Sequence, residues 1–342
     1  MSYISSLKNE NDVLTFDLNN NSKEIKISLV NSIRRIIISD IETYIIDNKN
    51  VTFYENSSML NNEFLKHRLS LIPIISNLDN TNYENLVISC KKSNDSENME
   101  SIYVSDFECK DSIKGEIIDN NLIFKYPKIL FGKIKNGQNV SFEGKLTKNN
   151  LTHGGAFFSP VSACIYTFKI DEEKVKEVTE NMTESEKITF NTLENERIYI
   201  RNDNGEPNVY QFHIESIGFY DSLIIFNLGI NLLINKLNII KLEIRNKKSK
   251  KVISLENIDN PDFYDFLIDG ENETLGNLLS TYITYDSNVF YCGYVIEHPL
   301  KKNIILRIKL NSDNTEDNSI TVIEQNIDII INILNKINNE VK

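Results

Sequence analysis

Histidine and cysteine are the first residues to consider for chemistry, and their spacing favours neither catalysis nor a metal site. The four histidines are isolated in the sequence, so only folding could bring a pair together for acid–base work. Cys90 and Cys109 supply at most half of a zinc ligand set, and no second pair lies near them. Metal binding at these two thiols is therefore left open but not predicted. The histidines are His67, His153, His213 and His298, and the remaining cysteines are Cys164 and Cys292.

Sequence motifs of known enzymes are also missing. The chain has no P-loop, no G-x-G-x-x-G, no H-E-x-x-H and no G-x-S-x-G string. Asp262, Asp265 and Asp269 lack the alternating ligand spacing of a calcium loop, and a turn at Asp269-Gly270 explains them. We therefore expect no catalytic residue, no metal and no cofactor. A hydrolase assembled from scattered carboxylates is the competing enzyme hypothesis.

Length and charge restrict the classes of function further. The 342 residues can bury a substantial core and are expected to form two or more domains. The net charge of −12 argues against a stand-alone nucleic-acid binder, because phosphate binding needs a clustered positive surface. No run of 18 apolar residues and no secretory signal is evident, and the cysteines are widely spaced. These features predict an intracellular protein without a membrane span.

Residue usage indicates an A/T-rich genome. The chain contains 48 Asn, and only 7 of its 37 basic residues are Arg. Asn, Lys and Ile are encoded by A/T-rich codons, so the bias bears on the source of the protein and leaves its fold open.

Apolar periodicity predicts two helices near the N-terminus, after a strand at Val13–Leu18. Arg34 and Arg35 lie off the apolar face of the first helix and are expected to point outward. The second helix follows the caps Asn61-Asn62, has Glu63 in its first turn and stops before Pro73. The apolar positions are Leu29, Ile33, Ile36, Ile37 and Ile41 in the first helix, and Leu65, Leu69 and Ile72 in the second.

Between Ile74 and Ser159 the residue pattern changes to short strand-like segments separated by polar loops, which predicts a mostly β inserted domain. Lys91–Glu100 is expected to be a solvated loop, and the charged segment Asp171–Asn195 a surface excursion that is helical in part. The strands expected in the insert are Leu86–Ser89, Ile102–Val104, Leu122–Tyr126 and Val140–Phe142.

Two long helices, near residue 230 and at the C-terminus, repeat apolar residues at alternating spacings of three and four. This 3.5-residue period is typical of helices that pack along a common seam. Each helix could instead lie on the sheet of its own domain, but two matching seams favour packing on each other or on a shared core. The seam residues are Leu223, Phe226, Ile230, Leu233 and Leu237, and Ile323, Ile327, Ile330, Leu334 and Ile337.

A basic connector, Arg245–Lys251, separates these helices. We interpret it as a solvated linker, with a nuclear-targeting or nucleic-acid-binding patch as the alternative. A small module follows it. The module's predicted order is a strand at Phe263–Ile268, a helix through Leu275, strands at Val289–Ile296 and Asn303–Leu310, and the long terminal helix.

Several strings, taken in order, resemble the assembly platform of cellular multisubunit RNA polymerases. They are similar to the third-largest subunit of eukaryotic RNA polymerase II, the archaeal D subunit and the bacterial alpha N-terminal domain. The strings are Asn31-Ser32-Ile33-Arg34-Arg35-Ile36, Asn62-Glu63-Phe64-Leu65-Lys66-His67-Arg68-Leu69-Ser70-Leu71-Ile72-Pro73, Ser159-Pro160-Val161-Ser162-Ala163 and Phe212-His213-Ile214-Glu215-Ser216-Ile217-Gly218.

A further group of strings is similar to a different subunit, the small partner called L in archaea and the eleventh subunit in eukaryotes. It comprises Glu273-Thr274-Leu275-Gly276-Asn277-Leu278-Leu279, Asn288-Val289, Gly293-Tyr294, His298-Pro299-Leu300 and Ile305-Leu306-Arg307-Ile308. Departures from the family pattern are Ser70 in place of Gly, Phe157-Phe158 in place of Trp, and an insert without the cysteine cluster of many relatives.

The resemblance implies an α+β fold in which one polypeptide carries both halves of a heterodimer. It assigns residues 1–74 and 160–243 to an alpha-like dimerisation domain, 75–159 to the inserted domain, 244–261 to a linker and 262–342 to an L-like partner module. Such a fusion, together with the A/T-rich bias, suggests a large DNA virus. The expected location is then the virion and the host cytoplasm, or the nucleus.

The function implied by the resemblance is non-catalytic: a platform that nucleates polymerase assembly. Its expected partners are the largest and second-largest subunits and other small subunits, with nucleic acid reached only through the complex and no membrane or homodimer involved. Arg34, Arg35, Glu63, His67 and Arg68 are expected at the large-subunit interface. Internal bracing is an equal alternative for His67 and Arg68. A stand-alone nucleic-acid-binding transcription regulator and a homodimeric module are the alternative functions.

Overall fold

The first sheet is built from two distant parts of the chain. The computed structural model describes residues 2–76, 82–246, 248–255 and 262–341, and its first strands, β1 (Ile4–Glu10) and β2 (Val13–Asn19), form a hairpin. β11 (Val209–Ser216) pairs with β2, and β10 (Val161–Phe168) pairs with β11, giving the order β1-β2-β11-β10. The apolar residues of β2 and β11 alternate with polar ones, so one face of this antiparallel sheet is buried.

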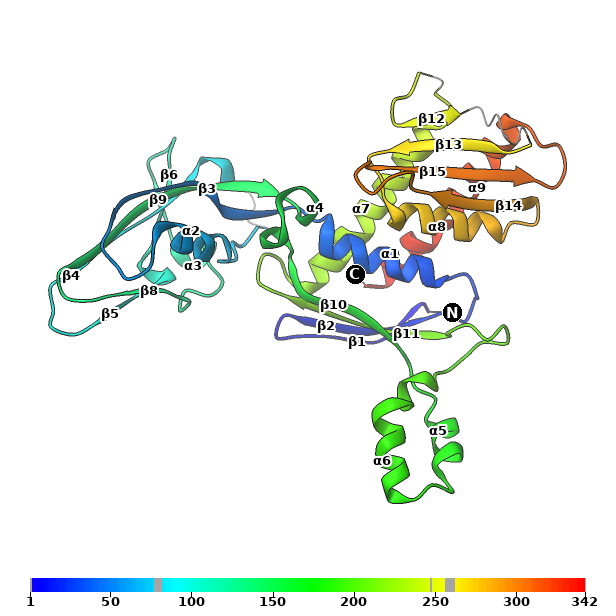
Figure 1. Ribbon diagram of the computed structural model, residues 1–342, viewed down its shortest axis with the longest axis horizontal. Coiled ribbons are helices and arrows are strands. Elements are labelled where there is room, and N and C mark those ends of the chain that lie inside the picture. Colours follow the sequence, from blue (N-terminus) through cyan, green and yellow to red (C-terminus); the bar gives the residue numbers. More distant parts are fainter. Residues whose placement is uncertain (1, 77–81, 247, 256–261, 342) are drawn as a thin grey trace.

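Two helices, α1 (Ile27–Ser39) and α7 (Ser222–Glu243), belong to the same unit and contribute to the core over that buried face (Figure 1). They approach closely because Gly229 of α7 faces Ile37 of α1: a Cβ at position 229 would lie 2.6 Å from Ile37 Cγ1. By length and composition alone, α7 is long and apolar enough to cross a membrane, a test that buried core helices pass as well. Here its apolar residues pack in the core, among them Phe226 and Ile230, which are fully buried.

The C-terminal unit repeats the topology of the first. Its strands are β12 (Val252–Leu255), β13 (Tyr264–Asp269), β14 (Val289–Val295) and β15 (Asn303–Leu310), and its helices are α8 (Glu273–Thr284) and α9 (Glu316–Val341). The sheet order β12-β13-β15-β14 matches β1-β2-β11-β10 strand for strand. In this correspondence α8 takes the place of α1, and α9 takes the place of α7.

The predicted linker, residues 244–261, differs from the structure in one respect. Val252–Leu255 forms β12 and pairs with β13, and its first residue, Val252, enters the core of the C-terminal unit. The described connection between α7 and β12 is therefore short. Residues 247 and 256–261 of the predicted linker lie outside the described part of the chain.

One apolar core joins the two units. It includes residues of β2 and α1, of β10, β11 and α7, and of every element from β12 to α9. The C-terminal module and the first unit therefore share a hydrophobic interior.

The inserted unit has its own core and lies to one side of the paired units in Figure 1. Its main sheet has the order β3-β9-β4-β6-β7, and β5 pairs with β8 in a second, smaller sheet. The strands are β3 (Thr43–Asn56), β4 (Leu86–Asn94), β5 (Glu100–Tyr103), β6 (Glu108–Asp111), β7 (Ile117–Ile118), β8 (Leu130–Ile134) and β9 (Gln138–Asn149). The helices are α2 (Asn62–Ser70), α3 (Asn120–Ile123) and α4 (Leu151–Gly154).

The boundary and some elements of the insert differ from the sequence predictions. β3 and α2 pack into the core of the insert, through residues such as Val51 and Leu65, although the predicted boundary followed residue 74. Lys91–Asn94 extend β4 beside β9 instead of entering a loop. Leu122–Tyr126 was expected to be a strand, but Asp119 caps a short helix there by accepting a hydrogen bond from the Asn121 amide.

A helical hairpin leaves the first sheet between β10 and β11. It consists of α5 (Glu172–Thr179) and α6 (Glu184–Leu193), within the segment expected to be a partly helical surface excursion. Figure 1 shows it projecting away from the body of the protein.

Candidate functional site

The strings that resemble two different subunits meet between α1 and α8. Arg35 of α1 donates from Nε to Thr274 Oγ1 of α8 over 2.8 Å, and its Nη2 lies 3.6 Å from Glu273 Oε2. Ser32 donates a hydrogen bond to the Thr274 carbonyl, 3.1 Å away, and also to the Ser28 carbonyl within α1. Each helix therefore supplies only part of this polar site, and neither unit could form it alone.

A polar cleft of about 200 Å³ opens between these helices. The side chains of Arg35 and Glu273 are 41% and 55% exposed, so both can still bond to a protein that enters the cleft. An arginine and neighbouring amides can recognise carboxylates and backbone carbonyls by hydrogen bonds. The cleft is lined by Asn31, Ser32, Arg35, Glu273, Thr274, Asn277 and Tyr294.

Local sequence determines where α8 begins and how closely it packs. The Asn272 side chain accepts a hydrogen bond from the Thr274 amide, and Glu273 is an acidic residue in the first turn, where the helix dipole favours it. Gly276 lies against the ring of Tyr294 on β14, and a Cβ at position 276 would be 2.6 Å from Tyr294 Cδ2. A small residue is required for α8 to approach this strand.

Arg34 and Arg35 were both expected to point outward, and in the structure the two side chains contact different groups. Arg34 is half-buried, and its Nε and Nη2 donate to Asn31 Oδ1 over 3.1 and 3.0 Å. Its charge acts on Cys164 and Tyr166 of β10: burial raises the pKa of both groups, and Arg34 lowers it in part. Arg35 bonds to α8, which is part of the same chain. Contact of either arginine with a larger subunit stays a prediction.

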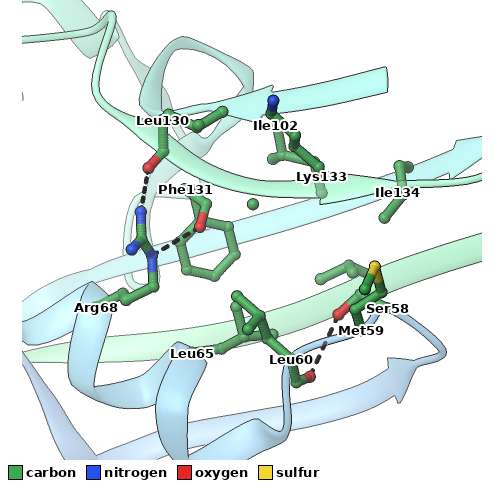
Figure 2. A pocket seen from close by; sticks show the side chains of 12 residues that line it. Ser58, Met59, Leu60, Leu65, Arg68, Ile102, Leu130, Phe131, Lys133 and Ile134 are labelled. Atoms are coloured by element: carbon green, nitrogen blue, oxygen red, sulfur yellow. Dashed lines mark hydrogen bonds between the residues drawn. The ribbon is translucent and has the colours of Figure 1, made fainter. Parts of the chain in front are cut away.

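The second predicted group, Glu63, His67 and Arg68, lies on α2 in the inserted unit. Arg68 donates from Nε to the Phe131 carbonyl over 2.9 Å and from Nη2 to the Leu130 carbonyl over 2.6 Å, as Figure 2 shows. These bonds attach α2 to β8, so Arg68 braces the insert from within. The His67 ring contacts Phe157 edge to face at 5.4 Å, and Glu63 is exposed.

An apolar cavity of about 280 Å³ lies beside Arg68. Met59, 72% exposed, stands at the cavity with Ser58 and Leu60 from the segment that precedes α2 (Figure 2). No sequence signal predicted this cavity, because its walls come from α2, β5, β8 and β9. The buried wall residues are Leu65, Ile102, Phe131, Ile134 and Val140.

The two helices with predicted seams, α7 and α9, are brought together in the shared core, where nine of the ten seam residues are buried and Leu223 is half-buried. Polar bonds also join the same two helices. Asn338 Nδ2 donates to Asn231 Oδ1 over 3.2 Å, and Lys241 Nζ lies 2.5 Å from Asp328 Oδ1. At the end of α7, Arg245 forms a two-bond contact with Glu324, with both distances 2.7 Å.

A cluster of charges that sequence reasoning missed also joins the two units. Lys236 of α7 lies 2.9 Å from Asp40 Oδ2 and 3.1 Å from Glu271 Oε2, and Glu271 also contacts Lys251 at 3.0 Å. Burial disfavours the charge of Lys236, but Glu271 and Asp40 outweigh burial and raise the pKa of Lys236. No spacing in the sequence links these four residues, which come from separate elements.

The cysteines lie apart from this interface chemistry. All four are free and buried, and burial raises the pKa of Cys90 and Cys109 to about 11 and that of Cys164 and Cys292 to about 12. Thiols of this kind are protonated and unreactive at neutral pH. Within the described ranges, no three His, Cys, Asp or Glu side chains are grouped so that they could hold a metal ion.

Comparisons with known proteins agree with the pairing of two similar units. Residues 22–237 match a family described as the RNA polymerase Rpb3/Rpb11 dimerisation domain, and residues 264–340 match a second family with the same description. The chain is 25% identical over 199 residues to DNA-directed RNA polymerase II subunit rpb3 of Dictyostelium discoideum, covering 52% of this chain and 63% of that protein.

Archaeal relatives give the same result. DNA-directed RNA polymerase subunit Rpo3 of Methanosphaera stadtmanae is 25% identical over 232 residues, which cover 56% of this chain and 81% of the relative. The Rpo3 subunit of Methanocaldococcus jannaschii is 51% identical over 53 residues, covering 16% of this chain and 27% of the relative. The chain thus spans less than two thirds of the length of the Dictyostelium and Methanocaldococcus relatives.

Proposed function

Because the chain belongs to the RNA polymerase Rpb3/Rpb11 dimerisation domain family, we propose that it is a non-catalytic assembly platform of a DNA-directed RNA polymerase. In this proposal one polypeptide supplies both members of the dimer on which the enzyme is built. The observation that carries it is the shared apolar core between two units of the same topology, each of which matches a dimerisation-domain family.

Covalent linkage would change how the dimer forms. Two separate chains associate at a rate set by their concentration, whereas linked partners meet at an effective concentration of roughly millimolar. The connection from Glu243 to Val252 is short: it begins at the end of α7, which packs on α9, and ends at β12, which pairs with β13. The pair is therefore expected to form in every molecule, with fixed stoichiometry.

We propose that the largest and second-largest polymerase subunits, with other small subunits, are the partners. The α1–α8 cleft supports this, because it combines residues from both units and exposes Arg35 and Glu273 to an incoming chain. Arg34 and the exposed Glu63 would extend the contact surface. Nucleic acid would be reached only through the complex.

A large DNA virus is our proposal for the source, and the virion and host cytoplasm, or the nucleus, for the location. The support is the A/T-rich residue usage together with two dimerisation domains in one chain.

Affinity purification of the tagged chain from its natural expression host, followed by mass spectrometry, tests the function. We expect the two largest polymerase subunits to co-purify, and their absence from the wild-type preparation would contradict the proposal. Arg34→Ala combined with Arg35→Ala should leave a folded protein that recovers much less of them. Arg197→Ala combined with Arg201→Ala is a matched control, because it removes two exposed arginines elsewhere.

The bond from Arg35 to Thr274 requires one more variant. Thr274→Val removes the side-chain acceptor of Arg35 but keeps both arginines. If this variant loses the large subunits as fully as the arginine double variant does, the arginines act through the pairing of the units. Normal recovery with Thr274→Val and loss with the double variant would support direct contact.

A further inference from the structure

The outer face of the C-terminal sheet carries an unusual row of apolar residues. Strand register aligns Ile253 of β12, Leu267 of β13, Ile305 of β15 and Val295 of β14 in one line across all four strands. Their neighbours on the same strands, such as Phe266 and Ile268, belong to the shared core, and these four do not. Because side chains alternate between the faces of a sheet, the row lies on the face turned away from the core.

The row is apolar where an antiparallel sheet of this kind is ordinarily polar. Ile253 and Val295, at the two edges, are 40% and 51% exposed. Ile305, in the middle, is only 8% exposed although it contributes to no core, because Leu267 and Val295 flank it. Four aligned aliphatic side chains thus form one continuous strip.

The first sheet provides a comparison within the same chain, because its strands occupy the same positions. Its outer rows run Ser5, Asp17, Gln211, Thr167; Lys8, Thr15, His213, Ile165; and Glu10, Val13, Glu215, Ala163. Each row is mostly polar: the apolar residues in these three rows are Val13, Ala163 and Ile165, and Ile165 is 49% exposed on the edge strand equivalent to β14. The same fold therefore accepts a polar outer face, and the apolar strip is particular to the C-terminal unit.

Charged and aromatic groups border the strip on the side toward Phe263. Arg307 donates from Nε and Nη2 to both carboxylate oxygens of Asp265, over 2.8 and 2.7 Å. Beyond this pair, Phe263 and Tyr291 meet edge to face at 5.8 Å, and Lys309 lies over the Phe263 ring. On the other side, Lys301 and Lys302 are exposed in the loop that joins β14 to β15.

We propose that this strip docks one amphipathic α-helix of another polymerase subunit, a proposal that rests on the proposed function. With strands about 4.8 Å apart, the strip is about 14 Å long and one side chain wide, so it matches the narrow apolar stripe of about nine residues of a helix lying across the four strands. The strip is far smaller than the roughly 800 Å² per partner of a standard interface, so it does not hold a second copy of this chain by itself. Lys302 makes no ion pair within the described residues and would favour an acidic residue beside the helix's apolar stripe.

The buried native thiols permit a selective probe of this surface. Val295→Cys would place an accessible thiol in the strip, whereas the four native cysteines are buried and their pKa values are raised by burial. Ile165→Cys, at the equivalent edge of the first sheet, is the matched control because its exposure is nearly equal. Both variants are compared as free chains and within the purified polymerase.

We expect the rate of thiol labelling at position 295 to fall by about tenfold or more on assembly, and the rate at position 165 to stay the same. A photo-cross-linker attached to the thiol of the Val295→Cys variant should then reach another polymerase subunit at residues three or four positions apart, the spacing of one helix face. Equal labelling at position 295 in the free chain and in the complex would overturn the inference. So would cross-linking only to a second copy of this chain.

A charge-insertion variant gives an independent measure. Ile253→Lys combined with Val295→Lys should retain the melting temperature, because both positions are exposed, but should lower recovery of the docked subunit several-fold; Ile165→Lys should not. Unchanged recovery with the double variant contradicts the inference alone. Failure of the wild-type chain to recover any polymerase subunit contradicts the proposed function, and this inference with it.

Discussion

The shared core between the two units can be tested at a pair of neighbouring residues on α9. Ile330 is fully buried, whereas Ile329 is 48% exposed, so one chemical change can be placed on either side of the seam. Ile330→Asp removes a buried aliphatic side chain, which typically costs about 2–5 kcal/mol. It also introduces a carboxyl group without a partner, which adds several kcal/mol if it is ionised.

Together these effects predict a loss of at least about 5 kcal/mol from the free energy of unfolding of the paired units. For a cooperative body of this size such a loss lowers the melting temperature by about 10–20 °C. Ile329→Asp places the same group in solvent and should cost about 1 kcal/mol or less. Differential scanning calorimetry of the two variants measures the contrast.

Separation of the units provides a second readout. Lys248 and Lys250 are already exposed, and weakened packing should loosen the backbone of segment 248–251, so we expect trypsin to cleave there faster in Ile330→Asp than in Ile329→Asp. The inserted unit has a separate core, and its hydrogen exchange should therefore stay unchanged in both variants. Indistinguishable melting and cleavage of the two variants would refute the idea that the core at Ile330 holds the units together.

Three further outcomes are expected. Arg68→Ala should destabilise the attachment of α2 to β8 by about 1–3 kcal/mol, because two backbone carbonyls lose a charged donor, and faster hydrogen exchange in α2 would report it; unchanged exchange would count against the bracing role. Gly276→Ala should lower the melting temperature because its methyl group would meet the Tyr294 ring, whereas Gly132→Ala, with no atom within 4 Å of the new Cβ, should not; equal effects would contradict the close-packing argument. The pKa values of the four cysteines are raised in the folded state, so the thiols of the unfolded chain ionise first as the pH rises. The free energy of unfolding should therefore fall as the pH rises above about 9, up to the folded-state pKa values of about 11 to 12. Chemical denaturation across this pH range measures the fall, and a free energy of unfolding that does not change with pH there would contradict the prediction.

Local apolar patterns were sufficient to predict several of the helices and strands that contribute residues to the shared core. The i, i+4, i+7 spacing from Leu29 predicted α1, and the 3-4 repeats predicted α7 and α9 with bounds close to those observed. The alternation from Ile304 to Leu310 predicted β15. These elements bury a regular face, so their apolar period is visible in the sequence without knowledge of the partner.

Elements that depend on distant partners could not be predicted in this way. β12 has only four residues and follows a run of lysines, and its strand character comes from pairing with β13. The placement of β3 and α2 in the insert follows from long-range contacts with β9 and β8. Likewise, the Lys236 cluster and the bond from Arg35 to Thr274 join residues 20 or more positions apart, and no local signal marks such pairs.

The duplicated topology gives one chain two similar units whose outer sheet faces differ. Two units with the same strand order pack through equivalent helices, α7 against α9, and each also presents one outer sheet face. In a homodimer both outer faces would be identical, and any partner that recognises one would bind twice. Here one outer face is polar and the other carries the strip from Ile253 to Val295, so a single partner orientation is favoured. In the proposed function, a platform that binds two different large subunits needs such a difference between its halves, and a single polypeptide would fix that difference in every molecule.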